Sequence, residues 1–413
     1  MHFSSTKSLV FLLMLLCNLL LAQPVWFQQN SPASPDLNSV YAVDANIVYA
    51  VNSSGGILKT INGGNNWVSQ NSGIPYPLYS IFFTDANTGF AGGALGILLR
   101  TTNGGLNWNG VNTGTTYYLR DIHFPPGGTG NIGFISAGGG SILKTSSNGV
   151  NWSMLTTNTT SELYSVYFTD ANTGYACGDA GIIIKTTNSG TNWIPQTSTT
   201  NSTLRAIHFI NPTTGFTVST NSRVYKTTNG GDTWALFFNQ GLCGLYSVYF
   251  ANEQTGWVCG CEGAINGTTN GGSNWILQSF ASTTYLYSIS FANTYTGWAV
   301  GASGKILKTT NGGITAIQQF SNEVPVEYKL FQNYPNPFNP TTNVHFTLPK
   351  ESNVSLKIFD ISGHEVASYV NNEMLKAGTY NVEVNASGWS SGIYFYTLQT
   401  NDFTATKKMM LVK

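Results

Sequence analysis

The sequence has unusually few charged residues. Only 9% of its 413 residues are charged, against about 25% in an average soluble domain. The charges also balance, with 18 basic and 18 acidic residues. Nucleic-acid binding depends on a surplus of basic side chains, so the composition argues against a nucleic-acid partner.

Cysteines are also scarce, and the five in the chain match no zinc-binding spacing. We therefore expect no metal and no cofactor. Cys177 and Cys259 occupy the same place in a repeated unit of the sequence, which predicts that both are small core residues. Cys243 and Cys261 flank one expected hairpin, and we predict a disulfide between them if the chain is exported.

Long hydrophobic runs are absent after residue 21. The run from Leu9 to Leu21 follows Lys7 and precedes Ala22 and Gln23, which is typical of a secretory signal peptide over residues 1–22. This run is too short to span a membrane as a helix. We expect no membrane span once the signal peptide is removed.

One short motif organises the rest of the sequence. It reads KTTNGGDTW from Lys226 to Trp234, and its variants end at Trp67, Trp108, Trp152, Trp193 and Trp275. Successive tryptophans are 41 residues apart (108−67, 193−152, 234−193 and 275−234), with one step of 44 (152−108). The same period reaches Trp26 in one direction and Ala316 in the other, which makes seven units. A fixed period of this length predicts a repeat fold.

Each unit is expected to form four short strands. In the second unit they are residues 78–83, 89–93, 97–101 and a strand that starts at Trp108. The Asn-Gly-Gly of the motif favours a tight turn, because glycine adopts positive φ and asparagine can bond its own backbone. Seven four-stranded sheets predict an all-β, seven-bladed β-propeller over residues 23–316. A β-solenoid is the alternative, although its repeats are usually shorter.

Two segments are candidates for the last strand of the seventh blade. They are Trp26–Gln29, which precedes the first blade, and Ala316–Gln319, which follows the last motif. We favour the N-terminal segment, because it keeps the tryptophan and joins the first blade to the last.

The repeat ends near residue 316. Residues 317–327 are expected to be a linker, and residues 328–413 a small immunoglobulin-like β-sandwich. Its expected strands are the alternating runs at 343–348, 354–359, 378–384, 392–398 and 407–412.

The repeat resembles known propeller families. Its motif looks like the Asp-box, whose pattern is Ser/Thr-x-Asp-x-Gly-x-x-Trp, although asparagine or Ser147 stands at the acid position here. The unit FTDANTGYACGDAGIIIKTTNSGTNW, from Phe168 to Trp193, resembles the repeat of the photosystem II stability/assembly-factor family. This resemblance implies a propeller, and it implies little about function because propellers serve many functions.

Three motifs near the C-terminus resemble the type A sorting domain of the type IX secretion system. They are YPNPFNPTT from Tyr334, SGIYFYTLQ over Ser391–Gln399, and KKMMLVK over Lys407–Lys413. The resemblance implies a Gram-negative host of the Bacteroidota type and passage through the periplasm. It also implies that the outer-membrane translocon recognises residues 328–413, and that the protein is secreted or held on the cell surface.

Aligning the units singles out two positions of the first strand. The first position holds Asn38, Tyr79, Arg120, Tyr164, Arg205, Tyr246 and Tyr287. Three residues later come Tyr41, Phe82, His123, Tyr167, His208, Tyr249 and Ser290. If this strand is innermost, both sets surround the central channel.

An acidic or carbohydrate ligand would suit such a channel, because arginine offers bidentate donors and tyrosine a stacking face. The candidate binding residues are Arg120, Arg205, His123, His208, Tyr79, Tyr164, Tyr246 and Tyr287. The alternative is that Arg120 pairs with Asp121 or a neighbouring carboxylate, that the histidines pack between blades, and that nothing binds.

Catalysis would require acids in the same region. A glycoside hydrolase needs two carboxylates, and the candidates are Asp121, Glu162, Asp179 and Glu262. We find no Ser/His/Asp motif, phosphate-binding loop or metal cluster. Three functions therefore remain: a non-catalytic module that binds a protein or glycan, which we favour, a glycoside hydrolase, and a structural surface protein.

Overall fold

The computed structural model describes residues 26–126, 130–239, 244–280, 284–313, 317–321, 323–386 and 389–413. The expected signal peptide lies outside these residues. One compact unit spans Val25–Ile314, and another contains Thr315–Lys413. The described residues include no helix long and apolar enough to cross a membrane.

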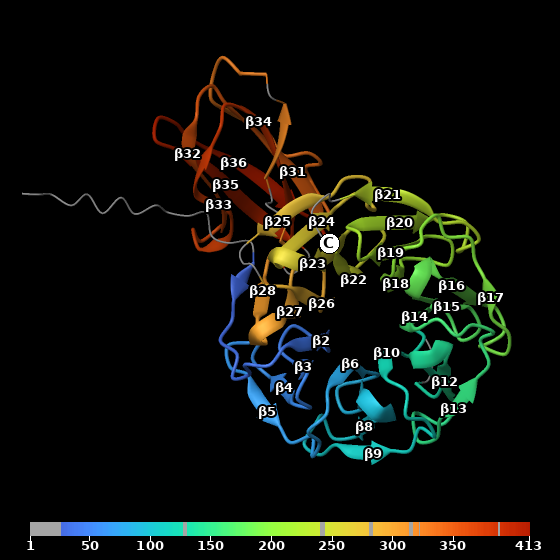
Figure 1. The fold of residues 1–413 in the computed structure, drawn as a ribbon. Helices are drawn as coiled ribbons and strands as arrows, with labels where there is room; N and C mark the ends of the chain where they lie inside the picture. Colours follow the sequence, from blue (N-terminus) through green and yellow to red (C-terminus); the bar gives the residue numbers. More distant parts are fainter. Residues whose placement is uncertain are drawn as a thin grey trace, which may run out of the picture. The chain divides into compact units, whose positions relative to one another are not determined.

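The first unit consists of seven antiparallel four-stranded sheets, which confirms the propeller (Figure 1). The innermost strand of each blade borders the central opening; these strands are β2 (Leu37–Ala42), β6 (Leu78–Phe83), β10 (Leu119–His123), β14 (Leu163–Phe168), β18 (Leu204–Phe209), β22 (Leu245–Phe250) and β26 (Leu286–Phe291). The second strands are β3 (Val48–Asn52), β7 (Gly89–Gly93), β11 (Gly133–Ala137), β15 (Gly174–Gly178), β19 (Gly215–Ser219), β23 (Gly256–Gly260) and β27 (Gly297–Gly301).

The third strands precede the motif, and they are β4 (Ile57–Thr60), β8 (Leu98–Thr101), β12 (Ile142–Thr145), β16 (Ile183–Thr186), β20 (Arg223–Thr227), β24 (Ala264–Thr268) and β28 (Ile306–Thr309). The outer strands are β5 (Val68–Gln70), β9 (Asn109–Val111), β13 (Ser153–Leu155), β17 (Ile194–Pro195), β21 (Ala235–Asn239), β25 (Ile276–Phe280) and, in the seventh blade, β1 (Phe27–Gln28). Short 3₁₀ turns join the second and third strands of five blades: η1 (Ala94–Gly96), η2 (Gly138–Gly140), η3 (Asp179–Gly181), η4 (Cys261–Gly263) and η5 (Ala302–Gly304).

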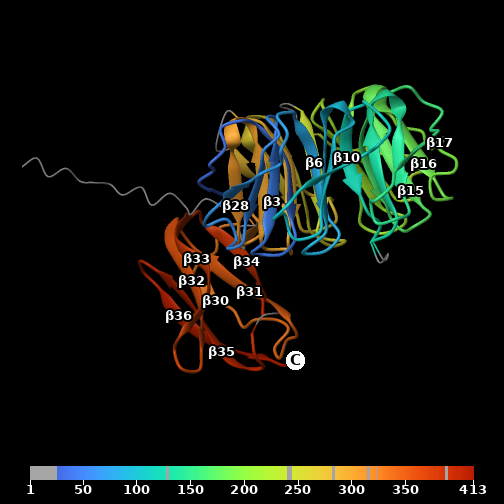
Figure 2. The ribbon, with the colours of Figure 1, turned by 90° about the horizontal axis from the view of Figure 1, so that it is seen from below.

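The N-terminal segment closes the ring of blades, as expected. Strand β1 pairs with β28, with Phe27 opposite Lys308 and Gln28 opposite Leu307. Figure 2 shows the ring from its edge, and Val48 of β3 in the first blade shares a core cluster with Ile306 of β28 in the seventh. The last blade is therefore built from both ends of the propeller sequence.

Aromatic side chains fill the spaces between blades. Between the first two blades, the Tyr49 ring stacks on Phe83 with centroids 4.0 Å apart, and Trp108 meets Phe83 edge-on at 6.0 Å. The same arrangement recurs between later blades, for example with Tyr175 and Trp234 around one phenylalanine. The repeated tryptophan is thus a packing residue, as its place in the motif predicts.

The motif is held by its own side chains. In the first blade, the Gly64 amide donates to the Thr60 hydroxyl at 2.8 Å, and the Asn66 amide donates to Asn62 Oδ1 at 2.9 Å. The Thr60 hydroxyl also donates to Asn62 Oδ1 at 3.0 Å. An asparagine oxygen therefore accepts the bonds that this turn requires, which explains why the position tolerates the loss of an acid.

The lysine that precedes the motif links neighbouring blades. Lys59 Nζ donates to the Gly104 carbonyl in the next motif at 2.7 Å, and Lys144 Nζ donates to the Ser189 carbonyl at 2.8 Å. Both ammonium groups also lie over an aromatic ring of their own blade. At these two positions the cation is used within the fold.

The second unit is a pair of four-stranded sheets around one apolar core. One sheet has the order β29 (Ile317–Ser321), β34 (Gly378–Asn385), β31 (Thr341–Leu348) and β30 (Lys329–Leu330). The other has the order β33 (Glu365–Leu375), β32 (Ser352–Asp360), β35 (Gly392–Thr400) and β36 (Thr404–Leu411).

Three of these strands were not expected from the sequence. Residues 317–321, which we expected in the linker, form β29 and pair with β34. Strand β33 pairs with β32 with three register shifts, and its sequence, EVASYVNNEML, has no regular alternation of apolar and polar residues from which a strand could be predicted. Strand β30 has only two residues, which is too short to show a pattern.

Candidate functional site

A cavity of about 730 Å³ runs between the seven inner strands. Each inner strand contributes its second, third and fifth residues to the wall, and the first residue, always leucine, is buried in the blade. In every blade the pairing with the second strand shifts register between the first and third residues. This bulge allows two consecutive residues to face the cavity, where a regular strand would allow only one.

The wall therefore has three layers of side chains. The mouth layer is formed by the second residues: Asn38, Tyr79, Arg120, Tyr164, Arg205, Tyr246 and Tyr287. The serine layer is formed by the third residues: Ser39, Ser80, Asp121, Ser165, Ala206, Ser247 and Ser288. The aromatic layer is formed by the fifth residues: Tyr41, Phe82, His123, Tyr167, His208, Tyr249 and Ser290.

The two arginines of the mouth layer have different surroundings. Arg120 forms an ion pair with Glu162, with Nε 2.6 Å from Oε1, and lies over the rings of Tyr79, Tyr118 and Tyr164 at 4.8–5.4 Å. A neighbouring carboxylate thus satisfies Arg120, and Asp121 does not.

Arg205 has a hydrogen-bond donor that no other described residue uses. Its guanidinium lies 4.3 Å from the centre of the Tyr164 ring and 5.7 Å from that of Tyr246. It forms no ion pair with any carboxylate of the described residues, and its buried Nε has no hydrogen-bond partner there. An arginine held between two tyrosines in this way can bind a carboxylate.

The serine layer joins each inner strand to the next. Ser39 Oγ accepts from the Ile81 amide at 3.3 Å, and Ser80 Oγ accepts from the Ile122 amide at 3.1 Å. Corresponding bonds follow from Ser165, Ser247 and Ser288. Ala206 has no hydroxyl and cannot make this link.

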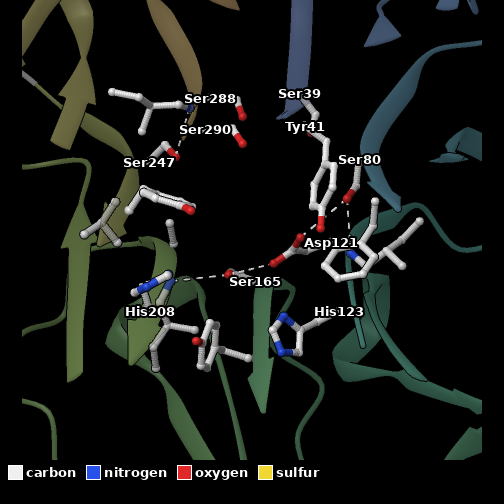
Figure 3. A pocket seen from close by; sticks show the side chains of 18 of the residues that line it. Ser39, Tyr41, Ser80, Asp121, His123, Ser165, His208, Ser247, Ser288 and Ser290 are labelled. Carbon is white, nitrogen blue, oxygen red and sulfur yellow. Dashed lines mark hydrogen bonds between the residues drawn. The ribbon is translucent and has the colours of Figure 1, made fainter. Parts of the chain in front are cut away.

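Asp121 takes the place of serine in the third blade. Its Oδ2 accepts from the Ser165 hydroxyl at 2.8 Å and the Val166 amide at 3.1 Å, and its Oδ1 accepts from the Ser80 hydroxyl at 3.4 Å (Figure 3). Burial within the channel wall raises the pKa of Asp121 to about 6, against the effect of these hydrogen bonds.

The aromatic layer holds its histidines in the neutral form. His123 lies between Phe82 and Tyr167, with ring centres 5.8 Å and 4.5 Å away, and its Nε2 donates to the Phe168 carbonyl at 3.1 Å. Burial lowers the pKa of His123 to about 4 and that of His208 to about 3. The remaining nitrogen of His123, Nδ1, is therefore an acceptor at neutral pH.

Two of the four candidate catalytic acids lie beside each other: the Asp179 amide donates to the Glu162 carbonyl at 3.0 Å, and both carboxylates act on Tyr164 of the cavity wall. Asp121 lines the cavity, and Glu162, Asp179 and Glu262 do not line it. Asp179 lies in η3 and accepts from the Thr203 hydroxyl at 2.9 Å, and Glu262 lies in η4. A glycoside hydrolase requires two carboxyl groups about 5–9.5 Å apart across one bond. Of the four candidates only Asp121 lines the cavity, while Glu162 is paired with Arg120 and Asp179 accepts from Thr203.

The cysteines follow the sequence reasoning in part. Cys177 and Cys259 are buried free thiols. Cys261 is disulfide-bonded, and its predicted partner, Cys243, lies outside the described residues. Among the described residues, no group of three or more His, Cys, Asp or Glu could hold a metal ion.

Family models match both parts of the chain. The model for the photosynthesis system II assembly factor YCF48 matches residues 186–276 and 239–333, and the model for the secretion system C-terminal sorting domain matches residues 332–413. The chain thus combines a propeller similar to that assembly factor with a C-terminal domain that matches the sorting-domain model. Such a sorting domain supports export to the cell surface or extracellular space in Bacteroidota-type bacteria.

Solved structures agree on the fold of this assembly-factor-like propeller. YCF48 bound to D1 peptide is 19% identical with a TM-score of 0.60, and covers 70% of this chain and 97% of that one. YCF48 from Cyanidioschyzon merolae is 21% identical with a TM-score of 0.57, over 69% and 98%. The WD40 β-propeller domain of Doa1 is 11% identical with a TM-score of 0.57, over 68% and 94%. No curated protein sequence matches the chain.

Sequence reasoning found the mouth and aromatic layers but missed the serine layer. Both of the predicted positions line the cavity, including Tyr79, Tyr246 and Tyr287. The serine layer was missed because it faces the cavity only through the bulge, which the alternation of a regular strand does not reveal. The recurrence of serine at one repeat position was the available clue.

Proposed function

We propose that the protein is an exported, non-catalytic propeller that binds a carboxylate-bearing ligand at the mouth layer of its channel. The proposal rests on the surroundings of Arg205. It is a cation without a carboxylate partner among the described residues, stacked between two tyrosines on the cavity wall. The sorting domain supports exposure of this surface outside the cell.

The tyrosines of the mouth layer suit either a peptide or an acidic polysaccharide. Tyr246 and Tyr287 meet edge-on at 5.6 Å, and Tyr285 lies beside both. Such a wall offers flat faces to sugar rings and to peptide side chains alike. One propeller of similar fold is described as bound to a peptide, which favours the peptide as the first ligand to test.

The test compares the mature protein with two arginine variants. The ligands are peptides with free or amidated C-termini, polygalacturonate and a neutral xylan, and the readouts are calorimetric binding and the release of reducing ends. Arg205→Ala should weaken binding of one carboxylate ligand at least tenfold, since it removes a charge-assisted hydrogen bond. Arg223→Ala is the matched control, because Arg223 lies in the same blade but does not line the cavity.

The possible results distinguish a binding module, a glycoside hydrolase and a structural protein. Binding lost in Arg205→Ala and kept in Arg223→Ala supports the proposal, and the ligand that binds identifies the class. Release of reducing ends that requires Asp121 would instead establish a glycoside hydrolase. Absence of binding to every ligand would favour a structural surface protein.

A further inference from the structure

Asp121 is an exception to the repeat. Five of the seven blades have serine at this position, and one has alanine. A serine hydroxyl is enough to accept the amide of the next strand, as Ser80 does for Ile122 at 3.1 Å. The link between strands therefore does not require a carboxylate, and the charge of Asp121 needs another explanation.

The charge of Asp121 is not balanced by the protein. Its three hydrogen-bond donors are two hydroxyl groups and one amide, all neutral. No cation of the described residues pairs with it, because Arg120 turns to Glu162. Asp121 is also the one carboxylate among the described residues that line the cavity. An unpaired carboxylate in a protein wall destabilises the fold unless a cation approaches it.

The neighbouring aromatic layer can receive such a cation. One step along the channel from Asp121, His123 lies between the rings of Phe82 and Tyr167. Figure 3 shows Asp121, Ser80, Ser165 and the ring of Tyr41 around the same cavity. Electron-rich ring faces attract ammonium and guanidinium groups, and the neutral His123 offers an acceptor.

We propose that the channel takes up an organic cation, a primary ammonium or guanidinium on a slim aliphatic stem, with the Asp121 carboxylate as its counter-ion. A lysine or arginine side chain of a partner protein and a free alkylamine both have this chemistry. A metal ion fits less well, because one carboxylate and hydroxyl groups make a poor set of ligands. The inference rests on the proposed binding role of the channel and adds a second, deeper subsite of opposite charge.

The test uses calorimetry on the full mature protein at pH 7.5. The probes are N-acetyl-lysine methylamide and n-butylamine, with N-acetyl-norleucine methylamide as the uncharged control. We expect saturable binding of at least one amine and none of the norleucine derivative. Asp121→Ser should weaken amine binding at least tenfold, and it installs the residue that the repeat itself uses.

Two further variants make the result specific. Ala206→Ser changes the same layer without changing its charge, and it should leave amine binding unaltered. If Asp121→Ser fails to fold, Asp121→Asn replaces it, because the amide oxygen can still accept from Val166. Binding of butylamine as tight as that of the lysine derivative indicates a free amine as ligand, and binding of the lysine derivative alone indicates a partner side chain.

The inference is overturned if neither amine binds saturably, or if both Asp121 variants bind amines as the parent protein does. Arg205→Ala distinguishes this outcome from a failure of the proposed function. That variant should lose the carboxylate ligand and keep the amine. Carboxylate binding without amine binding would leave the mouth site standing and remove the deeper one.

Discussion

At the scale of single residues, the titratable groups of the channel wall affect stability in opposite directions. Asp121 is a half-buried acid of the channel wall whose pKa is raised, and His123 and His208 are half-buried bases of the wall whose pKa values are lowered. In each case burial disfavours the charged form. The two effects have opposite signs over overlapping pH ranges, about 3.8–6 for Asp121 and about 3–6.5 for the histidines, so separate variants are needed to distinguish them.

The ionised form of Asp121 should destabilise the free protein at neutral pH. Its pKa is about 6 in the fold and 3.8 ordinarily, so the folded state holds the proton more tightly and loses stability as pH rises between these values. Asp121→Asn should raise the free energy of unfolding at pH 8 by about 1–3 kcal/mol, since one pKa unit corresponds to about 1.4 kcal/mol. The stabilisation by Asp121→Asn should decrease towards pH 4. Urea unfolding at pH 4, 6 and 8 measures it, and a gain independent of pH would contradict the explanation.

The two channel histidines should make the protein sensitive to acid. Their pKa values fall from 6.5 to about 4 and about 3 on folding, so the unfolded chain binds protons more tightly and stability declines as pH falls below about 6.5. The double variant His123→Tyr, His208→Tyr should flatten this decline. Tyrosine is the residue of three other blades, and Tyr249 donates to the Phe291 carbonyl at 3.0 Å much as His123 does to Phe168.

Thermal unfolding between pH 7 and pH 4 measures the histidine effect. His364→Tyr is the control, because His364 is exposed in the second unit. An unchanged slope in the double variant would assign the acid sensitivity to other groups.

At the scale of elements, the lysines before the motif hold neighbouring blades together. Lys144 Nζ donates to both the carbonyl and the hydroxyl of Ser189 in the next blade, each at 2.8 Å. Lys144→Met keeps most of the aliphatic stem and removes both bonds, so it should lower the free energy of unfolding by about 1–3 kcal/mol.

A lysine outside this slot provides the comparison for Lys144. Lys305 donates to Gln28 at 3.0 Å in an exposed position, and Lys305→Met should change stability by less than about 0.5 kcal/mol. Denaturant unfolding of the two variants measures the difference. Equal effects would mean that the inter-blade bond has no special importance.

At the scale of the whole propeller, the ring depends on a few residues at its N-terminus. Trp26 is 2% exposed, meets Phe291 edge-on at 5.6 Å and donates from Nε1 to Gln278 at 3.0 Å. Gln29 then accepts from Trp67 of the first blade at 3.1 Å. These contacts join the sixth, seventh and first blades through one short segment.

Trp26→Ala should therefore destabilise the propeller by about 3–5 kcal/mol, as expected for a large side chain removed from a core. Phe27→Ala is the matched control, because Phe27 is 37% exposed and should cost less than about 1 kcal/mol. Calorimetric unfolding of both variants tests the prediction. Similar melting temperatures would mean that the ring is closed by other contacts.

The sequence by itself determined the repeat, the blades and the order of the two parts of the chain. Turns depend on neighbouring residues, so the Asn-Gly-Gly motif and its period of 41 were enough to locate the blades and their strands. The lone Trp26, one period before Trp67, indicated how the ring closes, and the C-terminal motifs identified the sorting domain. These signals are short-range or periodic, so they can be read without knowing which distant residues meet.

The tertiary structure decided what the channel presents. The bulge in each inner strand turns the serine layer and Asp121 inward, and it depends on pairing with the second strand. Arg120 pairs with Glu162, which is 42 residues away in the next blade, and not with Asp121, which is its neighbour in sequence. The placement of Arg205 between Tyr164 and Tyr246 likewise needs three blades side by side. Charge pairing and burial depend on which residues meet in three dimensions. Only the folded ring could therefore show which arginine and which carboxylate remain unpaired.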